Sequence, residues 1–218
     1  MGALSMAAMY LATVRQPNGP WWRSAISPVV GLLAMTLLAT RFRRARKEQA
    51  GLAESRQGRT ADQVCANLGI AVVAAALAHI SAIHGICLLA LAAALVEATA
   101  DTLSSEIGQA LGGRTILVTQ LFTRMRQVEA GVDGAVSLSG TLAGAAGGLL
   151  VALICMWALQ LSLNGMLIAW LAGVAGMFYD SLLGATLERR GWLGNNAVNF
   201  LSTAFAAVLA AAVGFWIG

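Results

Sequence analysis

Six stretches of mainly apolar residues alternate with short polar segments along the chain. They lie at residues 24–40, 64–83, 85–103, 135–160, 166–187 and 197–217. Since a helix that crosses a bilayer needs roughly 20 apolar residues, the pattern predicts an all-α polytopic transmembrane helix bundle with about six spans. The first stretch carries the weakest signal, because it is short and contains Pro28.

The residues before the first stretch form a separate N-terminal segment, 1–23. Its apolar part, 1–14, is too short to span a membrane and lacks the basic beginning of a signal peptide. We expect an interfacial piece or a partial helix there, followed by a single membrane domain over 24–218.

Composition supports a membrane protein and excludes a soluble domain. Of the 218 residues, 58% are hydrophobic and 11% are charged, and the mean hydropathy is +0.74. Soluble domains carry about 25% charged residues. The spans use nearly the whole chain, so any chemistry must come from the helices and the loops between them. The formal charge of +4 does not indicate nucleic-acid binding, because the basic residues flank the apolar stretches.

The distribution of Lys and Arg predicts the orientation of the bundle. All but two of the fourteen lie in the segments that follow the first, third and fifth stretches, and the turns at 79–85 and 161–165 contain none. Because cytoplasmic loops are enriched in Lys and Arg, we expect an inner-membrane protein whose basic face is cytoplasmic. The basic segment 41–59 is expected to contact lipid headgroups rather than substrate.

Polar side chains of the apolar stretches gather at the same, cytoplasmic end. Glu97, Asp101 and Ser105 are four residues apart and share one helical face. The other polar residues expected at that end are Glu106, Asp133, Ser137, Asp180, Asn195, Asn196, Asn199 and Ser202. The sequence therefore predicts a polar pocket at the cytoplasmic interface.

Four carboxylates at this end are expected to have no lysine nearby to neutralise them: Glu97, Asp101, Glu106 and Asp180. Because an ionisable group inside a span is costly, a role with a divalent cation or in an ion pathway is favoured over a structural one. On a regular helix Glu106 points away from the face of Asp101. The fourth stretch, in contrast, begins with small residues at every fourth position, Gly140, Gly144 and Gly148. That spacing predicts close helix packing.

The motifs of phosphate-binding and hydrolytic soluble enzymes are absent from the sequence. There is no P-loop, Lys47 is the only lysine, and neither HExxH nor GxSxG occurs. Carboxylates together with substrate phosphates suit Mg²⁺, and arginine suits phosphate oxygens. Phosphoryl transfer to a lipid headgroup therefore fits the polar end, and a cation channel or transporter fits nearly as well.

Four blocks of residues carry a family resemblance. They are DQVCAN at 62–67, ADTLSSEIG at 100–108, GVDGAVSLSGTLAG at 131–144, and DSLLGAT at 180–186 followed by NNAVNFLS at 195–202. Over about 59–218 the chain resembles the integral membrane family called domain of unknown function 92, which includes the phytyl-phosphate kinases of plants and cyanobacteria.

The resemblance implies a membrane kinase that phosphorylates an isoprenyl (phytyl-type) monophosphate to the diphosphate, using CTP or another nucleoside triphosphate with Mg²⁺. It implies that Asp101, Glu106 and Asp180 are the catalytic, metal-binding carboxylates. The residues expected at the lipid and the nucleotide are Asn67, Gly131, Asp133, Gly134, Ser137, Thr141, Asn195, Asn196 and Asn199, with Arg114 and Arg124 as candidate phosphate clamps. The loop 129–135 lacks the prolines that the family often has there, which leaves the nucleotide donor open.

Two other functions stay open from the sequence. One is a nucleotidyl- or phosphoalcohol-transferring lipid enzyme, which would release pyrophosphate or a nucleoside monophosphate. The other is a small ion or metabolite transporter, whose polar groups would continue toward the outer face. The expected partners are a lipid phosphate and the membrane, not nucleic acid, and a homo-oligomer is left open.

Overall fold

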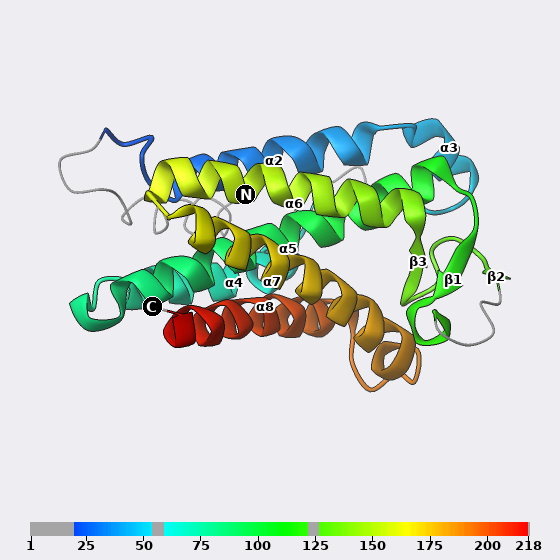
Figure 1. The fold of residues 1–218 in the computed structure, drawn as a ribbon. Helices are drawn as coiled ribbons and strands as arrows, with labels where there is room; N and C mark the ends of the chain where they lie inside the picture. The colour runs from blue at the N-terminus through cyan, green and yellow to red at the C-terminus, as the bar shows by residue number, and fades with distance from the viewer. Residues whose placement is uncertain (1–19, 54–58, 122–126, 218) are drawn as a thin grey trace.

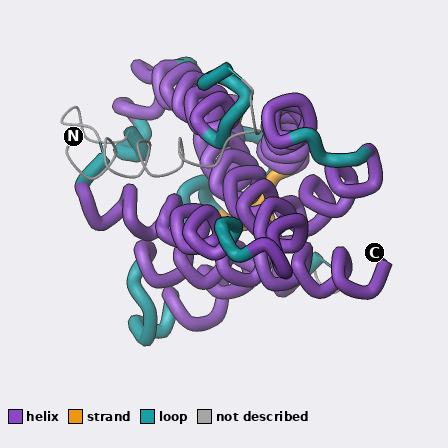
Figure 2. The backbone as a smooth tube through the Cα atoms, turned by 90° about the vertical axis from the view of Figure 1, so that its left-hand side faces the viewer, coloured by secondary structure: helices purple, strands orange, loops and turns teal. Residues whose placement is uncertain are grey.

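The computed structural model describes residues 20–53, 59–121 and 127–217 and shows a helix bundle with a small sheet at one end (Figure 1). The longer helices are α2 (Ile26–Arg41), α4 (Ala61–Leu77), α5 (His84–Leu111), α6 (Leu138–Leu159), α7 (Leu163–Leu183) and α8 (Asn195–Ile217). The short α3 (Arg44–Gln49) follows α2, and one π-helical turn, Gly184–Glu188, follows α7. Seen from one end, the helices cluster around a common axis, with the strands at the far end (Figure 2).

This architecture confirms the all-α membrane bundle. Among the described residues, four segments are long and apolar enough to cross a membrane: α5, α6, α7 with its π-helical turn, and α8. Helices α2 and α4 are apolar but have 16 and 17 residues, so the number of six spans stays a prediction. The expected third span ends at 103, whereas α5 continues to Leu111, because its polar last turns face cavities and neighbouring helices.

Helix α5 lies at the centre of the bundle and contacts α2, α4, α6, α7 and α8. Its middle is enclosed on every side, since each residue from Leu91 to Val96 is 0% exposed. Alanines and aliphatic side chains fill this core. A polar group that is buried without a hydrogen-bond partner is costly, so the polar residues of α5 need partners from the helices around it.

Glycines on α6 let this helix approach α5 closely. A Cβ atom at Gly140 would lie 2.5 Å from the backbone oxygen of Ser104, and one at Gly144 would lie 2.5 Å from that of Ala100. At Gly148 the nearest side-chain atom would be 3.1 Å away. Small residues at this spacing are typical of closely packed membrane helices. The close packing predicted for the three glycines is therefore confirmed.

Three short strands, which the hydropathy pattern does not predict, form an antiparallel sheet. Strand β1 (Thr115–Leu117) lies between β2 (Gln127–Val128) and β3 (Ala135–Ser137). The expected start of the fourth span at 135 is wrong, because β3 occupies those residues and α6 begins at Leu138. Ser137 caps α6 by accepting a hydrogen bond from Gly140 N at 3.1 Å.

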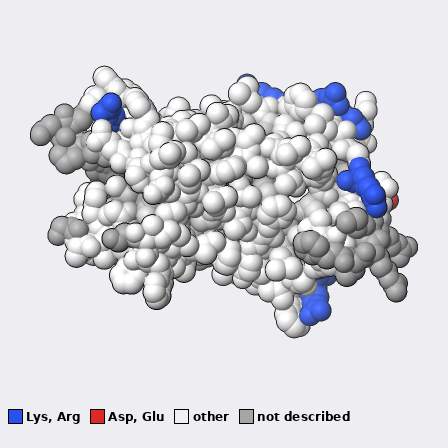
Figure 3. All heavy atoms as spheres, viewed as in Figure 1, with Lys and Arg blue, Asp and Glu red and all other residues white. Residues whose placement is uncertain are grey.

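We call the end of the bundle that carries α3 and the sheet the polar end (right in Figure 1). On the face drawn in Figure 3, Lys and Arg gather at this end, with one further basic patch at the opposite end, and the middle of the face carries no charged side chain. Large apolar side chains of the outer helices are exposed, among them Leu142, Leu171, Val208 and Phe215. An apolar exposed band of this kind suits contact with lipid.

Replacing Gly144 by Ala is expected to lower the melting temperature of the detergent-purified protein. The added methyl group would meet the Ala100 oxygen at 2.5 Å and the Met177 sulfur at 2.7 Å, and overpacking of this kind typically costs about 1–3 kcal/mol. Gly85→Ala is the matched control, because a Cβ atom there has nothing within 4 Å. A G144A protein that melts like G85A would contradict the close α5–α6 packing.

Candidate functional site

Two adjoining cavities lie at the polar end of the bundle. The first has a volume of about 170 Å³ and the second of about 210 Å³. Both are lined by Asn195, at the start of α8, and by Asp101, Ser105 and Gln109, which lie at every fourth position of α5. We call these three α5 residues the α5 ridge. Because the ridge belongs to both linings, it forms a shared wall between the cavities.

The first cavity lies among α5, the end of α7 and the loop that precedes β3. Asp180 lines it from α7, Asp133 from the loop and Glu188 from the π-helical turn. Asp180 Oδ2 accepts a hydrogen bond from Ser202 Oγ of α8 at 3.2 Å, which fixes this carboxylate between two helices. All the charged side chains in the described lining of the first cavity are acidic.

Two glycines bring the loop 130–135 into backbone contact with the end of α7. Gly134 has a φ of +73°, and a Cβ atom there would lie 2.2 Å from Ala185 N. At Gly184 a Cβ atom would lie 2.8 Å from Gly134 N. Any side chain at Gly134 would therefore displace the loop from α7 and open the wall of the first cavity.

The second cavity lies on the other side of the α5 ridge, against the beginnings of α4 and α8. Gln63 and Asn67 line it from α4, and Asn199 lines it from α8. A capping box starts α4, in which Thr60 Oγ1 accepts from Gln63 N and Gln63 Oε1 accepts from Thr60 N at 2.8 Å. The buried Asn67 donates from Nδ2 to Gln63 O at 2.8 Å. The first turns of α4 thus hold these amide side chains in defined positions.

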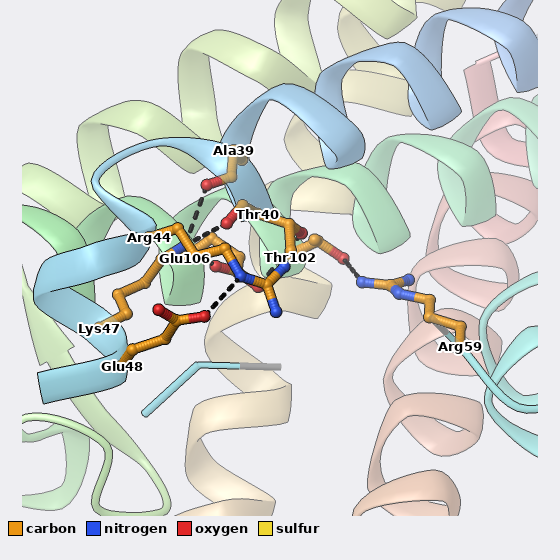
Figure 4. A network of polar contacts seen from close by, with 8 residues as sticks. All are labelled: Ala39, Thr40, Arg44, Lys47, Glu48, Arg59, Thr102 and Glu106. Carbon is orange, nitrogen blue, oxygen red and sulfur yellow. Dashed lines mark hydrogen bonds and ion pairs between the residues drawn. The ribbon is translucent and has the colours of Figure 1, made fainter. Parts of the chain in front are cut away.

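Arg59, just before α4, supplies the second cavity with a positive charge. Its Nη2 donates a hydrogen bond to Thr102 Oγ1 at 3.1 Å (Figure 4), and this hydroxyl donates in turn to Ala98 O at 2.8 Å. Arg59 is therefore held against α5. Arg59 thus lines a cavity between helices, and contact of segment 41–59 with lipid headgroups rather than substrate stays a prediction.

Glu106 faces α2 and α3 and forms an ion pair with Lys47 (Figure 4). Positions 101 and 106 are about 140° apart around a regular helix, so the two carboxylates lie on different faces. Lys47 is 1% exposed, and its Nζ also donates to Ala39 O at 3.1 Å and Thr40 O at 2.9 Å. Thr40 Oγ1 donates to Glu106 Oε1 at 3.3 Å. The expectation that no lysine lies near the four carboxylates is therefore wrong for Glu106.

The structure brings most of the predicted site residues together at the two cavities. The first is lined by Asp101, Gly131, Asp133, Gly134, Ser137, Asp180 and Asn195. The second is lined by Asn67, Asp101, Glu106, Asn195 and Asn199. Arg114, Thr141 and Asn196 line neither of these cavities, and Arg124 lies outside the described residues.

Some lining residues escape the sequence prediction although signals for them exist. Gln109 continues the spacing of Asp101 and Ser105 by one more step of four residues. Arg59 directly precedes the capping box that begins α4, which puts it beside the first helical turn at the polar end. Glu188 carries no such signal, because it stands beside basic residues in a segment that the sequence assigns to a loop.

The oxygen ligands of the first cavity suit Mg²⁺ bound together with phosphates. Asp101 and Asp180 line it from two different helices, and four serines add hydroxyl groups. Within the described residues no group of three His, Cys, Asp or Glu side chains is placed to hold a metal ion, so Glu106 does not complete a three-carboxylate site. Mg²⁺ commonly binds through one or two protein carboxylates with phosphate and water oxygens, which fits Asp101 and Asp180.

Comparison with protein families assigns the chain. The profile of the family described as integral membrane protein DUF92 matches residues 1–207. The chain belongs to this family. The match includes both cavities and stops within α8.

Relatives of the chain include two uncharacterized membrane proteins. That of Synechocystis sp. is 34% identical over 178 residues, which cover 78% of this chain and 66% of the relative. That of Methanocaldococcus jannaschii is 36% identical over 115 residues, 53% of this chain and 46% of the relative. The chloroplastic protein VTE6 of Arabidopsis thaliana is 30% identical over 185 residues, 79% of this chain and 53% of VTE6. The chain thus spans about half to two thirds of the length of these relatives, and no solved structure matches it.

Replacing Lys47 by Met is expected to destabilise the protein strongly. The change would leave the buried Glu106 carboxylate without its cation, and breaking a buried ion pair on one side typically costs about 3–5 kcal/mol. The expected result is a large fall in melting temperature in detergent, partly restored in the double variant Lys47→Met/Glu106→Gln.

The control for this change is Arg44→Met, in the same short helix. Arg44 pairs with Glu48 at 3.0 Å, and their side chains are 30% and 38% exposed, so their pair contributes at most about 1 kcal/mol. If the Lys47 variant melted at the same temperature as the Arg44 variant, the Lys47–Glu106 ion pair would not stabilise the bundle.

Proposed function

We propose that this protein is a membrane-embedded kinase that transfers a phosphoryl group from a nucleoside triphosphate to an isoprenyl monophosphate of the phytyl type. The observation that carries the proposal is the meeting of Asp101, Asp180 and the loop 130–135 in one cavity at the polar end of a membrane bundle. The family resemblance supports the same reaction. We further propose that the protein lies in an inner membrane with this end on the cytoplasmic side. The reason is that Lys and Arg, which gather at this end, are enriched in cytoplasmic loops.

Phosphoryl transfer requires a protein to position the substrates and to neutralise the charge of the phosphates. The residues of the first cavity can do both. Mg²⁺ held by Asp101 and Asp180 would supply positive charge to the phosphate oxygens. The hydroxyls of Ser104, Ser105 and Ser181 line the same cavity and can donate hydrogen bonds to those oxygens. Attack by a phosphate oxygen needs no nucleophile from the protein, which agrees with a cavity of carboxylates and hydroxyls.

A transporter is supported less well, because no charged residue of α5 lies between Glu97 and His84 at the start of the helix. Beyond Glu97, toward the opposite end, Leu91 to Val96 are apolar and 0% exposed. A pathway for ions needs polar groups or a water-filled cavity through the depth of the membrane. Both of the polar cavities described above lie at one end of α5. This distribution suits a reaction at an interface.

Replacing Asp101 or Asp180 by Asn is expected to lower lipid-dependent nucleotide consumption by about 100-fold or more, since each change removes a charge aimed at the phosphates. The purified protein would be tested with phytyl or geranylgeranyl monophosphate and CTP, ATP, GTP or UTP, with Mg²⁺ present or chelated. Asp62→Asn is the control, because Asp62 lies exposed in the first turn of α4 and lines neither cavity.

The product identifies the reaction class. A kinase releases a nucleoside diphosphate, whereas a nucleotidyltransferase releases pyrophosphate. Wild-type protein that consumes none of the four nucleotides, or D101N and D180N proteins that remain fully active, would contradict the proposed function.

A further inference from the structure

The two cavities differ in charge although they share the α5 ridge. The described side chains that line only the first cavity include three carboxylates and no basic group: Asp133, Asp180 and Glu188. The charged side chains that line only the second are Arg59 and Glu106, and the charge of Glu106 is already met by Lys47. Asp101 on the shared ridge adds one carboxylate to both cavities, and the second cavity is therefore the less negative of the two.

Neutral groups of the second cavity also favour an anion. Helices α4 and α8, with 17 and 23 residues, both begin at this cavity, which Gln63 and Asn195 line from their first turns. The N-terminal end of a helix carries partial positive charge and unpaired backbone N–H groups. The side-chain amides of Asn67 and Asn199 add further donors. Together with the Arg59 guanidinium, which matches phosphate oxygens in pairs, these groups suit one phosphate without a metal ion.

The acidic first cavity suits a different form of phosphate. Carboxylates repel phosphate oxygens unless a cation lies between them, so this cavity favours a polyphosphate that arrives with Mg²⁺. A nucleoside triphosphate is such a ligand, while a lipid monophosphate finds its countercharge in the second cavity. The charge of each cavity thus separates the two substrates of the proposed kinase.

The size and place of the second cavity fit a lipid head. Its volume of about 210 Å³ is below the roughly 300 Å³ from which sites that enclose small molecules begin, so it would hold a phosphate and leave a hydrocarbon chain outside. Further along α4 and α8 from the cavity, the two helices pack together, since a Cβ atom at Gly69 would lie 3.6 Å from the Phe200 ring. Val73 and Phe200 are 55% and 44% exposed on these helices, which gives an isoprenyl chain an apolar surface beside its phosphate.

We propose that the second cavity is the binding site of the isoprenyl monophosphate, with Arg59 as its cationic ligand, and that the nucleotide phosphates occupy the first cavity. This inference rests on the proposed function for the identity of the two substrates. The substrates then meet over the α5 ridge, where Asp101, Ser105 and Gln109 border both cavities.

The transfer balances without a further reactant. An oxygen of the lipid phosphate dianion forms a bond to the γ-phosphorus while the bond from the γ-phosphorus to the β–γ bridging oxygen breaks. The nucleoside diphosphate leaves with the electron pair of that bond. Because the attacking oxygen of a dianion carries no proton, the step requires no general base, and Arg59 serves to hold the lipid phosphate in line.

Binding of radiolabelled phytyl monophosphate to the full chain in lipid nanodiscs, without nucleotide, tests the assignment. Arg59→Gln is expected to weaken this binding at least tenfold, and Arg59→Lys less, because lysine keeps the charge but loses the paired geometry. Arg41→Gln is the matched control, since Arg41 is exposed at the end of α2 and lines neither cavity. Asp180→Asn is expected to bind the lipid phosphate like wild type, because Asp180 lines only the first cavity.

The outcomes separate this inference from the proposed function. Wild-type affinity in R59Q, loss of lipid binding in D180N, or wild-type protein that prefers phytyl monophosphate no more than phytol would overturn the site. If wild type binds the lipid phosphate through Arg59 but consumes no nucleotide, the proposed kinase fails and the anion site stands. Where R59Q does not melt and elute like wild type, Asn199→Ala in the same cavity takes its place, with the same weakened binding expected.

Discussion

The burial of α5 on every side is the constraint on which the rest of the structure depends. A helix enclosed by five others can keep polar residues only where neighbours supply partners. Partners reach the last turns of α5 at the polar end: Arg59 binds Thr102, and Lys47 binds Glu106. Glu97 marks the limit, because it is 1% exposed and its Oε1 has no hydrogen-bond partner among the described residues. The site therefore lies at the end of α5, and the membrane-depth part of the helix is apolar.

Contacts made by glycine decide which polar groups meet. Gly140 and Gly144 bring α6 against α5, and Gly134 with Gly184 brings the loop 130–135 against the end of α7. These contacts involve backbone atoms, so they leave little freedom in the distance between the elements. As a result, a carboxylate from α5 and one from α7 face the same cavity as the loop. The lack of a side chain at these glycines thus allows the close contacts that position the charged side chains of the cavity.

Hydropathy predicts the helices well because the requirement for apolar residues in lipid is local in sequence. The polar end could also be predicted, since Asp101, Asp180 and Asn195 lie at those ends of the third, fifth and sixth apolar stretches that are expected on one side of the membrane. The side chains that contact the polar residues at this end could not be predicted from the sequence. Lys47 and Glu106 are separated by 59 positions, and hydropathy does not say which helix faces lie against each other. Arg59 looked like one more basic residue of a membrane-flanking loop, a composition that topology alone explains.

The Lys47 anchor explains how a short helix can contribute to the site. Helix α2 has 16 residues, and its last turn leaves backbone carbonyls without helical partners. Lys47, from α3, donates hydrogen bonds to two carbonyls of that turn and to Glu106. The two carbonyls are those of Thr40 and of Ala39, and the latter also accepts from Phe42 N at 3.1 Å. One buried ammonium group thus caps α2, holds α3 and neutralises a carboxylate beside the second cavity. Since the chain runs on from α3 to Leu52 in the wall of that cavity, the same contact that ties α2 to α5 also holds one side of the anion site in place.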